Sequence, residues 1–165
     1  MTGRPVSSAG PVPTGADRRS LPLSGAPGTV ALGREFTRLA LRAWGWLPRG
    51  EDGPGTGGAG LPSEDAVRAA AADVLLMTSE LVTNACQHAT GPYRLELTRY
   101  GPLVRVAVRD GDDRPPVLRP RQVLARPGGH GLRVVDRLSA AWGCEPVDGG
   151  GKSVWLEIVR PPAEH

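Results

Sequence analysis

The stretch between Asp73 and Arg94 most constrains how this chain can fold, because it predicts one long helix whose polar face carries no Lys or Arg. Glu80 is the only formally charged residue inside the stretch. Helical geometry places Glu80, Asn84 and Gln87 in one narrow stripe, opposite an apolar face. Most helices with a single polar stripe are ordinary surface helices. This stripe lacks the Lys and Arg residues that usually keep such a face in water. We therefore expect it to line a binding site rather than to face bulk solvent.

Gly and Pro are unevenly distributed and mark the parts of the chain that we expect to be flexible. The 165 residues include 23 Gly and 17 Pro. Residues 1–27 hold few large apolar side chains, so we expect a disordered tail there. Residues 48–62 have the same character and predict a flexible loop between two helices. The remaining length suffices for one domain with a hydrophobic core, which we expect over residues 28–162.

The distribution of charge argues against direct binding to nucleic acid. Residues 1–62 carry seven Arg against four acidic residues, and residues 63–165 carry thirteen basic and thirteen acidic ones. The net charge of +3 therefore resides in the N-terminal part, and the rest lacks the basic surface of a nucleic-acid binder. No stretch is apolar enough for a membrane span or a signal-peptide core. We therefore expect a cytoplasmic protein without membrane contact.

The only two cysteines, Cys86 and Cys144, have neither the spacing of a disulfide framework nor that of a zinc site. Cys86 falls on the apolar face of the long helix. We therefore expect it to be a small core residue.

Periodicity along the chain predicts an α+β fold. Helical spacing of residues such as Phe36, Leu39 and Ala40 predicts a helix over 29–46, and a second helix starts from Ser63 as N-cap and runs to about residue 89. Alternating apolar residues predict strands over 93–100 and 103–109, joined as a hairpin. A short helix over 131–139 and strands over 141–145 and 153–159 follow. Such an order favours a two-layer α/β sandwich, with a mixed, mostly antiparallel sheet covered on one face by helices.

The segment Gly151-Lys152-Ser153 looks like the end of a phosphate-binding P-loop, but its context differs. That pattern needs a Gly where this chain has Pro146, and it opens a helix. The residues that follow here, VWLEIV, predict a strand instead. We interpret the segment as a glycine hairpin turn.

Three other features form a constellation that is more specific than any of them alone. Glu80 and Asn84 lie one turn apart on the long helix, and Asp110 ends a strand that is expected to be buried. The third feature is the cluster Gly128-Gly129-His130-Gly131-Leu132, which opens a helix. A strand-end Asp is usually a turn residue, and a lone glycine cluster is weak evidence. Their joint occurrence in this order is the informative observation.

With these residues the chain resembles the GHKL superfamily of ATP-binding domains, which have the Bergerat fold. The segment SELVTNACQHA resembles the N-box, VRDGDDRPP the first glycine box and GGHGL the second. The resemblance covers about residues 28–160 and is greatest for the anti-sigma-factor serine kinases and related actinobacterial regulators. The ending GKSVWLEI is similar to the last strand of that branch.

The resemblance implies a role for each residue of the constellation. Asn84 would bind Mg²⁺, which takes few protein ligands beside phosphate oxygens and water. Glu80 would be the general base that orients an attacking hydroxyl or water. Asp110 would accept a hydrogen bond from the adenine amino group. In this chain Gly111 follows Asp110 directly, which departs from the usual first box, and Asp112 and Asp113 add negative charge near a nucleotide.

The phosphate-binding part would lie at the start of the short helix and on the loop before it. Backbone N–H groups of Gly129, Gly131 and Leu132 would meet the phosphates. Residues 112–128 would form the ATP lid, on which Arg126, like Arg119 and Arg121, could pair with phosphate or simply be solvated. His88 could cover the nucleotide or cap its helix.

These roles predict a Mg²⁺–ATP-binding regulatory protein serine/threonine kinase. Its partners would be an anti-sigma antagonist of the STAS type, which it would phosphorylate, and a sigma factor, which it would hold in the other state. Members of this branch often form homodimers. The alternative is a non-catalytic module that binds ATP, or none, and works by sequestering a partner. A histidine kinase is disfavoured because no helix with a phosphoacceptor His precedes the domain.

Overall fold

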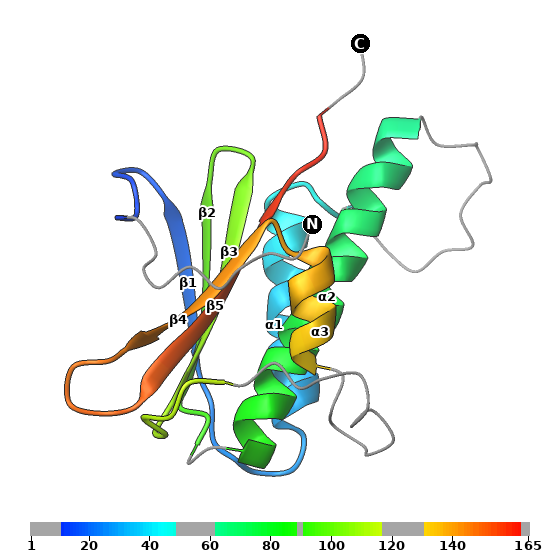
Figure 1. The fold of residues 1–165 in the computed structure, drawn as a ribbon. Coiled ribbons are helices and arrows are strands. Elements are labelled where there is room, and N and C mark those ends of the chain that lie inside the picture. Colours follow the sequence, from blue (N-terminus) through cyan, green and yellow to red (C-terminus); the bar gives the residue numbers. More distant parts are fainter. Residues whose placement is uncertain (1–10, 49–61, 89–90, 117–130, 163–165) are drawn as a thin grey trace.

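A computed structural model describes residues 11–48, 62–88, 91–116 and 131–162, and these form two layers. One layer is an antiparallel open sheet of five strands in the order β1-β2-β3-β5-β4, and the other contains three helices on one face of that sheet (Figure 1). The α+β class and the helices on one face were predicted, and every described strand pair is antiparallel. The elements are β1 (Asp17–Pro22), α1 (Thr29–Ala43), α2 (Pro62–His88), β2 (Arg94–Tyr100), β3 (Leu103–Asp110), α3 (Gly131–Leu138), β4 (Ala141–Pro146) and β5 (Lys152–Val159).

The central strands form because their alternating apolar side chains all reach the helix layer. In β3, Val104, Val106 and Val108 are at most 1% exposed, as the alternation predicted. The predicted hairpin of β2 and β3 is present, with Tyr100 paired to Leu103 across the turn. The buried residues that the sheet contributes to this core are Leu95, Leu97, Val104, Val106, Val108, Trp142, Val154, Leu156 and Ile158.

The first strand corrects the prediction of a disordered tail over residues 1–27. Residues 17–22 pair with β2 over the whole length of β1, from Asp17 opposite Arg99 to Pro22 opposite Arg94. Contacts with α1 hold the strand in place. The indole N–H of Trp44 donates to the Asp17 carboxylate at 2.9 Å, and the Arg19 guanidinium lies over the Trp44 ring. The folded unit therefore begins before residue 28.

The buried face of the first helix agrees with the prediction at Ala40, and Phe36 packs against the core as predicted, but it differs at Leu39. Leu39 is 53% exposed, whereas Thr37, Ala40 and Leu41 are buried. The buried face approaches its neighbours closely at Gly33, where an added methyl group would lie 3.4 Å from the Val82 side chain. The prediction that Leu39 faces inward is therefore wrong.

The long helix is confirmed, with two corrections. It starts at Pro62 rather than after Ser63. Proline is favoured at the first position of a helix, because the N–H group that it lacks would have no partner within the helix there. Cys86 is exposed, not a core residue, although the residue before it, Ala85, is buried. The rest of the predicted apolar face is buried, namely Val74, Leu75, Thr78, Leu81, Val82 and Ala85.

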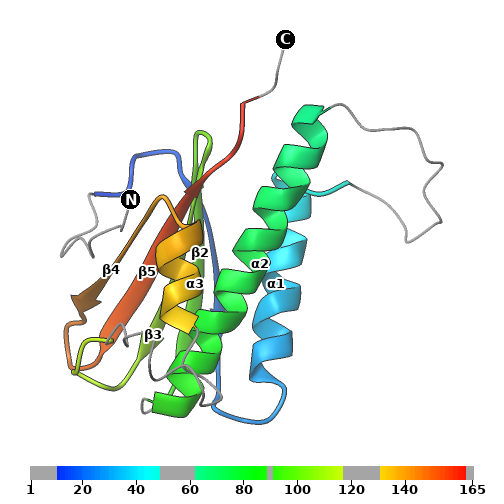
Figure 2. The same ribbon diagram turned by 45° about the vertical axis from the view of Figure 1, so that its right-hand side comes forward.

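Figure 2 shows α2 lying between α1 and α3 in the helix layer. Within the described ranges, none of the helices has the length and apolar character that crossing a membrane requires. The loop predicted over 48–62 and the lid predicted over 112–128 lie mostly outside these ranges.

Candidate functional site

Four segments that are distant in sequence meet at one end of the sheet, where β3 ends and β5 begins. Arg94 pairs with Arg109 and Asp110 pairs with Lys152, so the start of β2, the end of β3 and the start of β5 are adjacent. The segment that follows α2 is close as well, since a methyl group on Gly91 would lie 3.6 Å from the Asp110 Cα atom. The last turns of α2 and the start of α3 reach the same end of the molecule (Figures 1 and 2).

Glu80 and Asn84 lie in the second half of α2, one turn apart, and both are half-buried. Among the residues that the structure describes, neither side chain has a hydrogen-bond or ion-pair partner. Both side chains therefore keep their hydrogen-bonding groups unused within the described part of the chain. This arrangement leaves an acidic and an amide side chain available to a ligand.

Asp110 is buried at the end of β3, with 4% of its surface exposed. It shares its face of the strand with Val104, Val106 and Val108, so its side chain lies on the side of the sheet that the helices cover. Its Oδ1 atom accepts two hydrogen bonds, from the Lys152 ammonium at 3.0 Å and from the Asp112 backbone N–H at 2.9 Å. The structure therefore assigns this carboxylate an internal partner.

Lys152 is the residue that sequence reasoning missed. It is the only lysine of the chain and is 6% exposed, and its Nζ also donates to the Asp112 carbonyl oxygen at 3.2 Å. A signal for it was present in the sequence. Lys152 is in phase with Val154 and Leu156 of the predicted strand, so it had to lie on the buried face and needed a charged partner there.

The glycine turn before Lys152 is confirmed as a hairpin between β4 and β5. Val147 and Gly151 are joined by a hydrogen bond from the Val147 N–H to the Gly151 carbonyl, at 3.1 Å. Gly151 has a φ of +85°, and a side chain on it would overlap the carbonyl oxygen of Asp110. A glycine is required because the turn packs directly against the end of β3.

The additional aspartates after Asp110 are paired within the loop. Asp112 forms an ion pair with Arg114 at 2.9 Å, and hydrogen bonds from Arg114 lower the pKa of Asp112 to about 2. Asp113 Oδ1 accepts the backbone N–H of Gly151 at 2.6 Å. Asp113 therefore ties the loop to the glycine turn, whereas the charge of Asp112 is paired within the loop.

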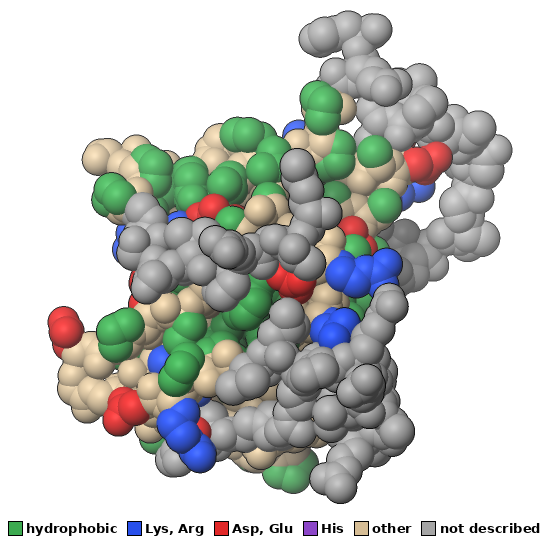
Figure 3. Space-filling view, in the orientation of Figure 1, with side chains coloured by type: hydrophobic (Ala, Val, Ile, Leu, Met, Phe, Trp, Pro, Cys, Tyr) green, Lys and Arg blue, Asp and Glu red, His purple; other side chains and the backbone are tan. Residues whose placement is uncertain are grey.

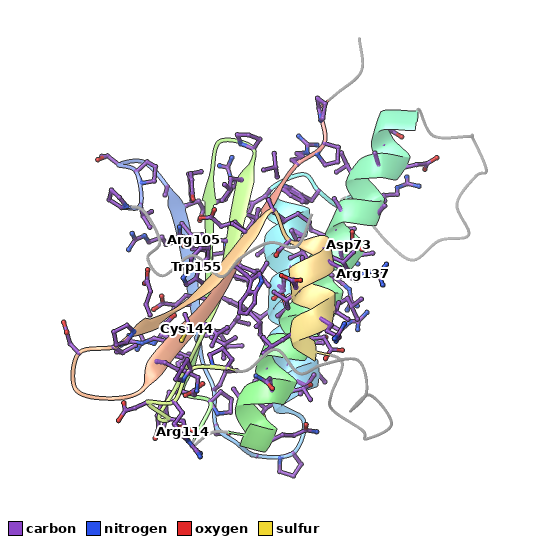
Figure 4. The ribbon with its side chains drawn as sticks, in the orientation of Figure 1. Asp73, Arg105, Arg114, Arg137, Cys144 and Trp155 are labelled. Atoms are coloured by element: carbon purple, nitrogen blue, oxygen red, sulfur yellow. The ribbon has the colours of Figure 1, made fainter. Side chains whose placement is uncertain are left out.

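Burial also shifts the pKa of two groups, one on α2 and one on β4. Removal from water raises the pKa of Asp73, which lies on α2 (Figure 4). It likewise raises the pKa of the Cys144 thiol on β4, an effect that the charge of Lys152 opposes. The Cys144 thiol is therefore protonated at neutral pH.

The other predicted site residues are placed only in part. Gly131 is the first residue of α3, and Leu132 is 8% exposed, so only its backbone N–H could meet a ligand. His88 is the last residue of α2, and its side chain is outside the described part. The residues that lie outside it altogether are Gly129, Arg126, Arg119, Arg121 and His130.

The described residues could supply only a small part of the oxygen ligands of a Mg²⁺ ion, so most of the ligands would have to be phosphate oxygens and water. Within the described ranges, no three His, Cys, Asp or Glu side chains gather into a metal-binding group. Asn84 could supply one amide oxygen, and phosphate oxygens and water would complete the octahedron. On the molecular face in Figure 3, Lys and Arg of the described residues are scattered, with no extended basic patch.

The face of the sheet opposite the three helices lines a separate hollow of about 240 Å³. Arg105 lies in its floor, stacks over the Trp155 ring at 5.1 Å and is paired with Glu157 (Figure 4). None of the predicted site residues lines this hollow. The candidate site therefore lies on the helix side, at the end of β3.

Comparison with known proteins adds no family assignment. The chain matches no protein-family model, and no curated protein matches it either.

Proposed function

We propose that this chain is a Mg²⁺–ATP-binding domain of the GHKL type that acts as a regulatory protein serine/threonine kinase. The observation that carries the proposal is the pair Glu80 and Asn84, half-buried and without partners in the described part of the chain. They lie on the helix that covers the same sheet end as the buried Asp110. The protein substrate would be an anti-sigma antagonist of the STAS type, and a sigma factor would be the second partner.

Phosphoryl transfer demands mainly positioning and neutralisation of charge, so a small set of residues suffices. Glu80 would accept the proton of the substrate hydroxyl as that oxygen bonds to the γ-phosphorus of ATP and ADP leaves. Asn84 would hold Mg²⁺, which neutralises charge on the phosphates when bound. The N-terminus of α3 would direct backbone N–H groups toward phosphate.

A second candidate function is a module that sequesters a partner without catalysis. The observation that favours it is the ion pair of Asp110 and Lys152, because an adenine amino group would have to share that carboxylate with an ammonium group. In this reading ATP is a structural or switching ligand, or is not bound.

Transfer of label from γ-labelled ATP to a STAS-type antagonist protein separates the two functions. We expect the wild-type chain to label the antagonist and Glu80→Gln to lose about 100-fold or more of the rate, as for a lost general base. Glu64→Gln is the matched control, because Glu64 is an exposed carboxylate in the first turn of the same helix. Label that survives in Glu80→Gln would overturn the role of Glu80. ATP binding without transfer in the wild type would favour the sequestering module.

A further inference from the structure

The ion pair of Asp110 and Lys152 keeps unused hydrogen-bonding capacity. An ammonium group has three N–H donors, and Lys152 uses two of them, on Asp110 Oδ1 and on the Asp112 carbonyl oxygen. A carboxylate accepts through both of its oxygens, but Asp110 Oδ2 has no partner among the described residues. Among the described residues, one N–H of the Lys152 ammonium and one oxygen of the Asp110 carboxylate therefore have no partner.

The pair is nearly buried, but Asp110 Oδ2 is not one of the fully buried side-chain atoms without a partner, which in the described part of the chain are Arg99 Nε and Trp155 Nε1. The side chains of Lys152 and Asp110 are 7% and 3% exposed. A hydrogen bond to a charged group in such a low-dielectric setting is stronger than one in water, so a ligand donor or acceptor at this pair would bind favourably. The neighbouring backbone keeps the pair in place, since Gly151 packs against the Asp110 carbonyl and donates to Asp113. A pair held in this way suits a ligand edge that presents an acceptor next to a donor.

We propose that Lys152 is a specificity-determining residue that reads the base together with Asp110. Asp110 Oδ2 accepts a hydrogen bond from the 6-amino group of adenine, and Lys152 Nζ donates to ring nitrogen N1. This inference rests on the proposed function, because it places the base of ATP at the end of β3. It adds a contact that neither the helix stripe nor the strand-end Asp supplies.

Two hydrogen bonds to neighbouring positions of the base explain how a carboxylate that is already paired with Lys152 can select adenine. The adenine edge carries a donor at position 6 and an acceptor at position 1, and guanine carries them in the opposite order. Guanine could meet the same two groups only with its edge reversed. Reversal of the edge also changes the direction in which the glycosidic bond leaves the base, so adenine and guanine nucleotides could not place their ribose and phosphates alike. The pair therefore selects the base and sets its direction.

The test uses the wild-type chain and three nucleotides, with binding measured by titration calorimetry in Mg²⁺. ATP is compared with 1-deaza-ATP, in which N1 is replaced by C–H, and with purine riboside triphosphate, which lacks the 6-amino group. We expect each analogue to bind at least about tenfold more weakly than ATP, as for a lost hydrogen bond to a charged group. Equal binding of ATP and 1-deaza-ATP would overturn the role of Lys152 and leave the proposed function standing. Absence of ATP binding would overturn both.

The variant Lys152→Met tests whether the preference for ATP over 1-deaza-ATP comes from the Lys152 side chain. Lys152→Met should bind ATP and 1-deaza-ATP with equal affinity, because the N1 contact is gone in both. Its folding is checked by circular dichroism, and the neutral double variant Lys152→Met/Asp110→Asn serves where the single variant is unfolded. A tenfold preference for ATP that persists in the folded variant contradicts the assignment.

Discussion

Replacement of Lys152 by Met isolates the energetic role of the buried pair at the end of β3. The two side chains are 7% and 3% exposed, so the charges have little access to water. Removing one partner of such a pair leaves an uncompensated buried charge and typically costs about 3–5 kcal/mol. For a chain of this length, that corresponds to a fall in melting temperature of about 6–20 °C. We expect Lys152→Met to show a loss of stability in this range.

The exposed ion pair between Arg94 and Glu96 gives the matched control. Its atoms are 3.9 Å apart and its side chains are 48% and 41% exposed. Pairs of this kind contribute about 0–1 kcal/mol, so Arg94→Met should change stability little. The loss of unfolding free energy of each variant is measured by urea denaturation. The midpoints of the transitions are compared where the dependence of the free energy on urea concentration is the same.

The double variant Lys152→Met/Asp110→Asn tests the cause. Because it removes both charges, it should be more stable than Lys152→Met alone, with a positive coupling between the two positions. A loss below about 1 kcal/mol for Lys152→Met, equal to that of the exposed control, would show that the pair is solvated and would refute the argument.

Three further predictions concern Gly151, Asp73 and Asp112. Gly151→Ala should cost at least about 2 kcal/mol more than Gly149→Ala in chemical unfolding, because both glycines have positive φ but only Gly151 lacks space for a side chain. Burial raises the pKa of Asp73 above its usual 3.8, so its charge destabilises the fold as pH rises through that range; Asp73→Asn should therefore be more stable than wild type at pH 7, and the difference should vanish under acid conditions where both are neutral. Hydrogen bonds from Arg114 lower the pKa of Asp112 from 3.8 to about 2, so its stabilisation is present above pH 3.8 and is lost as pH falls toward 2. Asp112→Asn should remove this acid dependence in thermal unfolding measured across that window.

The elements that sequence reasoning placed well are those whose own pattern decides their structure. In β3 and β5 alternate residues are buried, and all of them are apolar except Asp110 and Lys152 at one end; α2 buries a continuous apolar face. The strand β1 was missed because its six residues contain one large apolar side chain, Leu21. Its order comes from pairing with β2 and from contacts with Trp44, neither of which a local pattern reveals.

Two other differences have geometric causes. Successive residues of a helix point about 100° apart, so Leu39 and Leu41 lie on nearly opposite sides, and the face that packs against the core includes Leu41 and excludes Leu39. The pairing of Lys152 with Asp110 depends on the register between β5 and β3, which are neighbours in the sheet but are separated in the chain. The sequence showed that Lys152 needed a partner but could not identify which residue it was.

The central claim is that the chain binds Mg²⁺–ATP through Asn84, and thermal unfolding of the wild type and Asn84→Ala tests it most directly. With ATP at about 100 times its dissociation constant, the ligand should stabilise the wild type by about 2.7 kcal/mol, a rise of about 5–10 °C. We predict that this rise requires Mg²⁺ and is absent in Asn84→Ala. No rise at millimolar ATP, or an equal rise in the variant, would contradict the account.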